Sequence, residues 1–324
     1  MSTDMTVAEL ALLLSRVPGL GPRGVYKTLT RTDSGPDVLA CAVEDLRKCY
    51  GVSQSAAEFI CENAPALREE TRELAEKVAG LGIHVITVRD NLYPASLKAY
   101  QFHLPPVIYA YGNLNLLQER RFAIINSATI TERGSAAARD IANLLIDEGL
   151  TLVTGHNNQP YQLMVLTAKK RGAPIVIVLD RGIISAFHGL LDWQPVTMAR
   201  IWDPQFDPER DLVVSQFRLG DHWIGANSRL RDRMVFGLAD VVIACEVRSG
   251  GVMEKECLFA RERGRELLIC SYGEDDPAGN RALRQVGCQP LNVSDAKSQL
   301  ISLYIAPLFE GRTDDISDDG EPDD

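Results

Sequence analysis

The densest group of basic side chains is the segment NSRLRDR, which contains Arg229, Arg231 and Arg233. Helical spacing places Arg229 and Arg233 on one face, four residues apart, and points Arg231 elsewhere. Guanidinium groups bind phosphate oxygens in pairs, so this face suits a phosphodiester of a nucleic-acid backbone. A solvated helix face paired with Asp221 or Asp232 explains the pattern equally well, and both interpretations stay open.

A second candidate site is the turn in EVRSGGVMEKE, which follows an apolar run and opens a helical pattern. Ser249, Gly250 and Gly251 allow a ligand to approach the backbone, and the free N–H groups of a helix N-terminus attract anions. Glu254 lies in the first turn of that helix and would repel a phosphate placed close by. The segment therefore predicts either an anion site or a simple strand-to-helix turn.

Two further turns follow apolar runs. The segment AIINSATITERG has the strand, loop and helix order of a phosphate-binding turn, with Ser127 in the loop. The segment TGHNNQPYQLM contains Thr154 and Gly155 and then Asn157 and Asn158, which can cap a helix. Its histidine has no visible partner and is predicted to be neither base nor ligand. We expect ligands here because α/β sheets bind them beyond the carboxyl ends of their strands.

Apolar strands and amphipathic helices alternate along most of the chain. This pattern predicts an α/β fold, with a Rossmann-like, mostly parallel sheet covered by helices on both faces, over residues 83–309. A small all-helical domain over residues 1–82 is predicted to precede it. Its glycine- and proline-rich segment PGLGPRG favours a tight inter-helix turn, although a helix-hairpin-helix contact with a phosphate is the alternative. Residues 310–324 are predicted to form a disordered acidic tail.

Composition and charge narrow the function classes. The chain has 324 residues, 45% of them hydrophobic and 24% charged, as in ordinary globular proteins. Its net charge of −10 depends largely on residues 313–324, which hold seven acidic and no basic residues, because the rest carries 34 basic and 37 acidic residues. The seven cysteines form no CxxC pair, which indicates reduced thiols in a cytoplasmic protein. We predict no membrane segment, metal site, cofactor or catalytic residue, and no enzymatic activity.

Several segments together resemble the DprA/Smf family of bacterial DNA-processing proteins, over roughly residues 8–290. They are LLLSRVPGLGPRGVYKTL, the spacing YP..L.....PP..Y..G, RDRMVFGLADVVIACEVRSGG and RERGRELLICSYG. The resemblance implies a helical N-terminal domain and a Rossmann-like core. It also implies a homodimer that binds single-stranded DNA and loads the RecA recombinase onto it during transformation.

The departures from the family pattern fall in the predicted ligand turns. The family's Gly-Ser-Arg motif appears here as Asn126-Ser127-Ala128, and a threonine expected after the Ser-Gly pair is Glu254. An arginine is lost and a carboxylate is gained, while Arg231 and Arg233 are retained.

The leading hypothesis is single-stranded DNA binding through the arginine face, in support of RecA loading. The alternative is a small-nucleotide sensor, or a scaffold, in an antiphage defence system. The sensor would use Asn157, Asn158 and Glu254 to bind a base or ribose.

Overall fold

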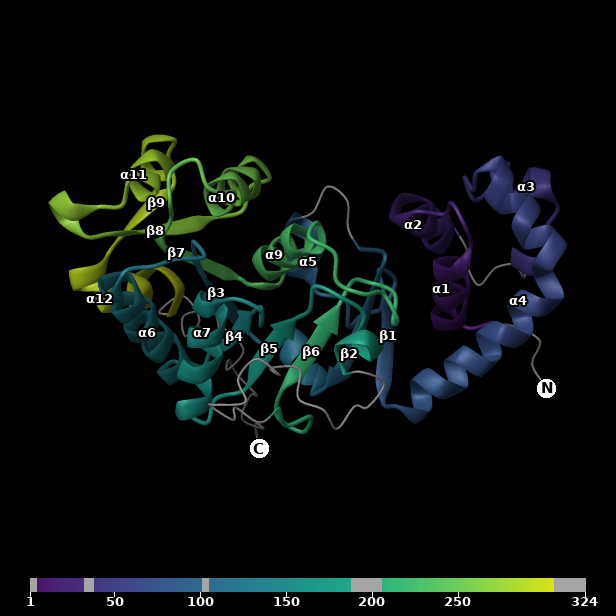
Figure 1. The fold of residues 1–324 in the computed structure, drawn as a ribbon, viewed down its shortest axis with the longest axis horizontal. Coiled ribbons are helices and arrows are strands. Elements are labelled where there is room, and N and C mark those ends of the chain that lie inside the picture. The colour runs from purple at the N-terminus through teal and green to yellow at the C-terminus, as the bar shows by residue number, and fades with distance from the viewer. Residues whose placement is uncertain (1–4, 32–37, 101–104, 188–205, 306–324) are drawn as a thin grey trace, which may run out of the picture.

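A nine-stranded sheet runs through the larger part of the molecule (Figure 1). The computed structural model describes residues 5–31, 38–100, 105–187 and 206–305. The strand order is β1-β2-β6-β5-β4-β3-β7-β8-β9. The strands are β1 (Ile83–Thr87), β2 (Val107–Gly112), β3 (Arg121–Asn126), β4 (Thr151–Thr154), β5 (Ile175–Val178), β6 (Leu212–Ser215), β7 (Val241–Glu246), β8 (Leu267–Ser271) and β9 (Gln289–Asn292).

The predicted mostly parallel sheet is confirmed. Only β2 runs against its neighbours, β1 and β6, and all other adjacent pairs are parallel. Strands β3, β4, β5 and β6 are buried at every position, as their continuous apolar sequences predict for a sheet covered on both faces. The sequence did not predict β9, because QPLN lacks an apolar run and only Leu291 is buried.

The helices of the sheet region cover both of its faces (Figure 1). On one face α5 and α10 contact α9, and α11 contacts α10. On the other face α7 and α12 contact α6. Their bounds are α5 (Ala95–Tyr100), α6 (Glu132–Asp147), α7 (Gln159–Lys170), α8 (Ile183–Ala186), α9 (Asn227–Leu238), α10 (Val252–Glu262), α11 (Ala278–Gln285) and α12 (Ala296–Leu300).

The order in which the chain forms neighbouring strands explains why the helices lie on two faces of the sheet. From β3 the chain moves through β4 and β5 to β6, and α9 then carries it back to β7 on the other side of β3. Right-handed crossovers in opposite directions place their helices on opposite faces. The strand order therefore reverses between β3 and β7, which is where sheets of this kind bind ligands.

The N-terminal region is helical, as predicted, with α1 (Val7–Arg16), α2 (Pro22–Arg31), α3 (Val43–Lys48) and α4 (Gln54–Gly80). The segments SQSAAEFICENA and PALREETRELAEKVAGLG, each with a helical pattern of its own, form the single helix α4, with Pro65 inside it. Helix α1 packs against both α4 and β1. No helix among the described residues is both long and apolar enough to span a bilayer. The predicted acidic tail lies outside the described residues.

Arg121, the first residue of β3, joins several elements at the amino edge of the sheet, where the parallel strands begin. Its guanidinium donates to the carbonyl oxygen of Leu238 at 2.7 Å and to two carbonyl oxygens of the 3₁₀ helix η2 (Leu114–Leu117). It also donates to Ser96 Oγ at 3.3 Å and lies 3.9 Å from Asp240. The residue is only 4% exposed, so this one side chain satisfies buried acceptors from three elements.

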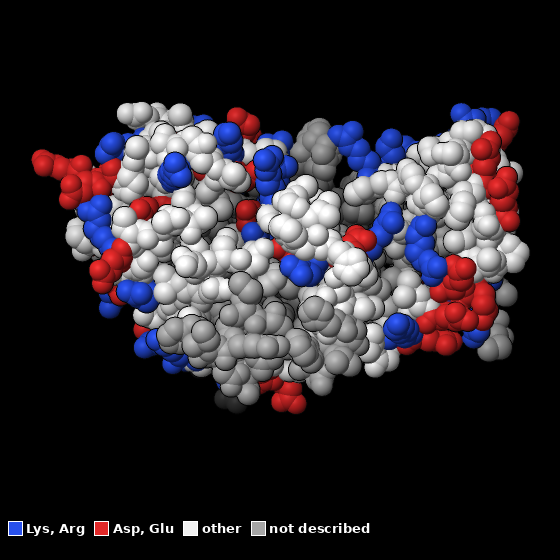
Figure 2. Space-filling model, in the orientation of Figure 1, with Lys and Arg blue, Asp and Glu red and all other residues white. Residues whose placement is uncertain are grey.

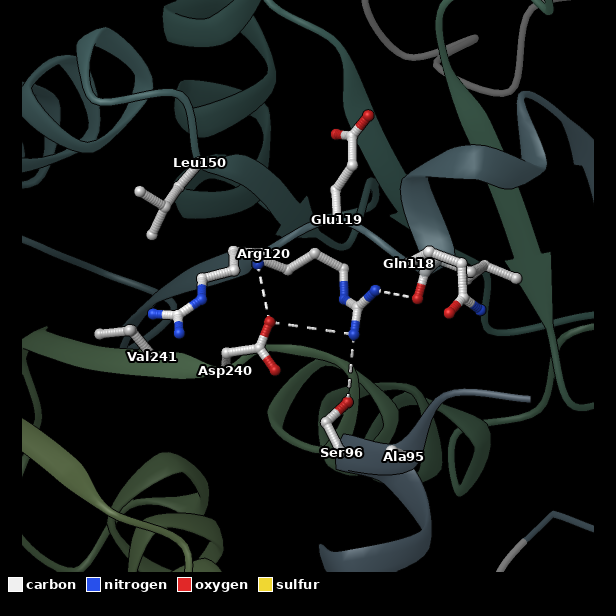
Figure 3. A pocket seen from close by; sticks show the side chains of 10 residues that line it. Ala95, Ser96, Gln118, Glu119, Arg120, Leu150, Asp240 and Val241 are labelled. Carbon is white, nitrogen blue, oxygen red and sulfur yellow. Dashed lines mark hydrogen bonds and ion pairs between the residues drawn. The ribbon is translucent and has the colours of Figure 1, made fainter. Parts of the chain in front are cut away.

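A cavity of about 400 Å³ lies beside this arginine, at the start of β3 and β7 (Figure 3). Ser96 and Asp240 face each other across it, and the neighbouring Arg120 lies at its side (Figure 3). The buried guanidinium therefore forms part of the wall of an open surface hollow.

Replacing Arg121 by lysine is expected to lower the free energy of unfolding by about 2–4 kcal/mol. An ammonium group cannot reach all of the acceptors that a planar guanidinium reaches, and it leaves some of them buried without a donor. Urea denaturation measures the change, and Arg120→Lys at the exposed neighbouring position is the matched control. Equal midpoints for Arg121→Lys and the native chain would show that these bonds contribute nothing.

Candidate nucleic-acid interface

The site predicted from the sequence lies at the carboxyl edge of the sheet, where the parallel strands end. Arg231 lies in α9 at this edge, but its side chain is buried, with a residue exposure of 2%. Its Nε donates to Asp232 Oδ1 at 2.8 Å, and its Cζ lies 4.8 Å from the centroid of the Tyr161 ring. The Tyr161 hydroxyl donates to the same aspartate oxygen at 2.8 Å. Arg231 is thus a neutralised structural residue rather than an open phosphate ligand.

Asn157 connects this arginine to a second buried carboxylate. Its amide oxygen accepts from Arg231, and its amide nitrogen donates to the carboxylate of Asp180, which is fully buried just beyond β5. Arg181 donates to the other oxygen of Asp180 at 3.1 Å, and Asn227 donates to its backbone carbonyl at 3.0 Å. The loops after β4 and β5 and the start of α9 are therefore held together by one polar network.

The other predicted residues of the loop after β4 have structural roles in this fold. A Cβ on Gly155 would lie 2.7 Å from the Tyr161 ring, so only glycine fits there. Asn158 caps α7 by accepting from the Tyr161 backbone N–H at 3.0 Å, which confirms the capping prediction. Thr154 is buried, and within the described structure its hydroxyl has no hydrogen-bond partner.

The predicted arginine face is only partly formed. Arg229 is exposed at the start of α9, whereas Arg233 is half-buried and binds Glu256, with N–O distances of 2.7 and 3.2 Å. Its Cζ also lies 3.9 Å from the centroid of the Phe259 ring. The expected clamp of Arg229 and Arg233 therefore needs correction, because a carboxylate already holds one of its two members.

The turn after β3 is also closed by internal bonds. Ser127 Oγ accepts from the Arg248 backbone N–H at 2.7 Å. The Glu246 carboxylate accepts from the backbone N–H of Thr131 at 3.0 Å and from its hydroxyl at 2.8 Å. A Cβ on Gly134 would lie 2.1 Å from that carboxylate. The N-terminus of α6 thus already faces a negative charge, which satisfies its dipole without a bound phosphate.

In the glycine turn before α10 a carboxylate of the chain likewise accepts from a backbone N–H group. Gly250 has a φ of +72°, and its N–H donates to Glu254 Oε2 at 2.7 Å. Ser249 is exposed, and Gly251 precedes α10 as its cap without a side-chain bond. The carboxylate predicted to oppose a phosphate therefore occupies the turn itself.

Three important residues of this edge were missed by the sequence analysis. Asp180 directly follows a buried strand, and that position was the available signal for it. Tyr161 was seen only as part of a helix, and its contact with Asp232 spans 71 residues of sequence. Trp223 lies in the loop after β6 and is 49% exposed, next to Ile224 at 60%. Exposed large apolar side chains beside an otherwise polar edge indicate a contact surface.

The acidic and histidine side chains of the described residues do not form a metal site. Within this part of the chain no group of three or more His, Cys, Asp or Glu side chains is arranged to hold an ion. The exposed side chains at the carboxyl edge instead include apolar ones, as at Trp223 and Ile224, and basic ones, as at Arg229.

A buried histidine in this network gives a pH-dependent prediction. Burial lowers the pKa of His156 to about 4, although Asp180 lies 4.0 Å away and opposes the shift. In the unfolded chain the pKa of this histidine is near 6.5. Between pH 6.5 and pH 4 the unfolded chain therefore binds a proton at this histidine that the folded chain does not. This residue should therefore remove up to about 3 kcal/mol of stability as the pH falls from 6.5 to 4.

Urea denaturation between pH 7 and pH 4.5 tests this prediction. His156→Gln should flatten the pH dependence of the unfolding free energy, whereas the exposed His84→Gln control should leave it unchanged. An unaltered slope in His156→Gln would contradict the assignment.

Comparisons with known proteins identify the family. Residues 84–301 match the model of the DNA recombination-mediator protein A family. DNA processing protein DprA of Streptococcus pneumoniae (strain ATCC BAA-255 / R6) is 25% identical over 184 residues, which are 56% of this chain and 61% of that protein. The match thus spans less than two thirds of this relative's length.

Two solved structures share the fold. DNA processing protein A of Streptococcus pneumoniae matches with a TM-score of 0.69 and 18% identity, over 93% of this chain and 99% of the other. DNA processing protein A of Helicobacter pylori, which has a unique single-stranded DNA binding mode, matches with a TM-score of 0.54 and 17% identity, over 68% and 96%. The resemblance seen in the sequence is confirmed, and the chain belongs to the DNA recombination-mediator protein A family.

Proposed function

We propose that this DprA-like DNA processing protein binds single-stranded DNA along the carboxyl edge of its sheet. The contact surface, called the rim below, consists of Trp223, Ile224 and Arg229 together with the exposed Arg218 and Arg248. The observation that carries the proposal is the exposed tryptophan beside exposed arginines at this edge. A relative of the same fold binds single-stranded DNA.

The chemistry of the rim suits an unpaired strand. Trp223 Nε1 donates to Ser228 Oγ at 3.4 Å, so the ring is held at the start of α9, where Arg229 is exposed. Bases stack on aromatic rings in a sequence-tolerant way, and a nearby guanidinium can contact the backbone phosphate. Duplex DNA keeps its bases stacked inside, so it offers no such face to Trp223.

The charge distribution supports the same edge. Acidic side chains gather over α4 (Figure 2), and a phosphate backbone is repelled there. The loops after β6 and β7 instead carry the exposed Arg218 and Arg248. Four strand spacings separate β6 from β7, or about 19 Å. The rim is therefore long enough to contact several nucleotides of one strand.

The buried Arg231 stabilises the fold beneath the rim and does not contact DNA in this proposal. Removing Arg231 leaves the buried Asp232 without its guanidinium partner and Asn157 without its donor, and such changes destabilise a fold by several kcal/mol. Weak DNA binding by an Arg231 variant would therefore report misfolding. Variants of exposed residues give the cleaner test.

Replacing Trp223 by alanine should weaken binding of an oligothymidylate of about 15 nucleotides by roughly 5- to 100-fold, because a stacked base contributes about 1–3 kcal/mol. Arg229→Gln should weaken binding less and should reduce the slope of log affinity against log salt by about one. Fluorescence anisotropy at several salt concentrations measures both. Arg139→Gln, at an exposed position of α6, is the matched control.

The same binding measurements can also contradict the proposed function. The proposal is wrong if the protein does not bind the strand at low salt, or if both rim variants bind like the native chain. Equal weakening by Arg139→Gln would show a general charge effect without a defined site.

The proposal includes the recombinase step and the homodimer that the family resemblance implies. A strand held along the rim would remain available for RecA to nucleate on. The native protein should then shorten the lag of RecA-dependent ATP hydrolysis on strands coated with a single-strand binding protein, and Trp223→Ala should not. Sedimentation should show a dimer under the same conditions. A monomer, or an unchanged lag, would limit the function to strand binding.

A further inference from the structure

Three arginines gather around two aromatic rings between α5, α9 and α10. The Cζ atoms of Arg233 and Arg263 lie 3.9 and 3.3 Å from the centroid of the Phe259 ring. Two guanidinium groups cannot share one face at these distances, so they enclose the ring. Arg265 lies 5.5 Å from the centroid of Tyr100, whose ring meets Phe259 edge-on at 6.5 Å.

Buried donors in this cluster lack acceptors. Tyr100 is 3% exposed, and its hydroxyl has no hydrogen-bond partner in the described structure. The same is true of the buried Nε atoms of Arg263 and Arg265. Native proteins leave few such groups unsatisfied, and an unfilled water or ion position is one of the usual reasons. The two Nε–H groups can only donate and the hydroxyl can also donate, which indicates a missing acceptor.

The guanidinium groups near the Tyr100 hydroxyl point to an anion as that acceptor. Burial raises the pKa of this hydroxyl and the Glu256 carboxylate raises it further, whereas Arg233, Arg265 and Arg263 act in the opposite direction. Glu256 is already bound to Arg233 through both of its oxygens. Arg263 and Arg265 instead donate to the backbone carbonyl oxygens of Phe259 and Gly237. Among the described residues neither makes a hydrogen bond to a carboxylate, and a partly buried guanidinium is costly without a directly bonded anion.

Arg263 and Arg265 use only part of their hydrogen-bonding capacity within the protein. Arg263 donates one N–H to the Phe259 carbonyl and lies 4.0 Å from the exposed Glu262. Arg265 donates one N–H to the Gly237 carbonyl, and Asp240 acts on it electrostatically. A guanidinium has five N–H donors, so each retains several. Basic side chains also gather on the surface between α10 and α9 (Figure 2).

We infer that this cluster binds a phosphate group through the guanidinium groups of Arg263 and Arg265 and the hydroxyl of Tyr100. A phosphate oxygen can accept from these donors, and its charge would pair with the two guanidinium groups that make no hydrogen bond to a carboxylate. Arg265 lies just before β8 and Gly237 just before β7, so the site is on the amino side of the sheet. It is therefore separate from the rim and does not depend on DNA binding there.

The phosphate can come from a small ion or from the end of a nucleic-acid strand. Inorganic phosphate, titrated calorimetrically with ionic strength held constant by sodium chloride, tests the first source. A 5′-phosphorylated oligothymidylate compared with its 5′-hydroxyl counterpart tests the second, in a Trp223→Ala background that weakens the rim. The first arm stays informative even if the rim binds no DNA.

Tyr100→Phe is the decisive variant. It removes only a hydroxyl that has no partner in the described structure, so the thermal stability without phosphate should stay the same or rise. Affinity for inorganic phosphate should fall by about tenfold, because hydrogen bonds to charged groups are strong. Arg263→Gln should reduce the affinity further, whereas Arg261→Gln, at an exposed position of the same helix, should not.

The outcomes separate this site from a structural cluster. Phosphate-dependent heat and stabilisation that are lost in Tyr100→Phe and kept in Arg261→Gln support the inference. It is overturned if phosphate has no effect on the native chain, or if Tyr100→Phe binds phosphate as tightly as the native chain does. Marked destabilisation of Tyr100→Phe without phosphate would also overturn it, because the hydroxyl would then have an internal partner.

Discussion

The buried guanidinium of Arg231 is the constraint on which the carboxyl edge of this protein depends. A charge at 2% exposure is tolerated only when it is paired and hydrogen-bonded, and here Asp232, Asn157 and the Tyr161 ring provide those partners. Asn157 extends the network to Asp180 beyond β5. Because the partners come from separate loops and helices, these elements cannot move apart without exposing or isolating a charge.

This internal pairing determines what the edge can offer a ligand. Glu246 faces the N-terminus of α6, and Glu254 binds the turn before α10, so both anion-attracting turns already contain a carboxylate. The exposed surface that remains combines apolar and basic side chains at the rim. Such a surface favours contact with bases and with a backbone together, rather than enclosure of a single phosphate.

Sequence patterns were sufficient for most of the fold because burial leaves a direct signature. Eight strands appear as apolar runs, and their order along the chain implies parallel pairing with helices between them. The exceptions have physical reasons. β9 is a polar edge strand with one buried side chain, and Pro65 lies within a helix that surrounding packing keeps continuous.

The sequence by itself determined the α/β class, the helical N-terminal region, the cap at Asn158 and the likeness to a family, because these depend on local pattern. Only the tertiary structure decided which arginines reach solvent. Arg229, Arg231 and Arg233 stand in one short segment, yet one is exposed, one is buried against Asp232 and one binds Glu256. Whether a charge is free depends on partners distant in sequence, and no spacing within a helix reveals them.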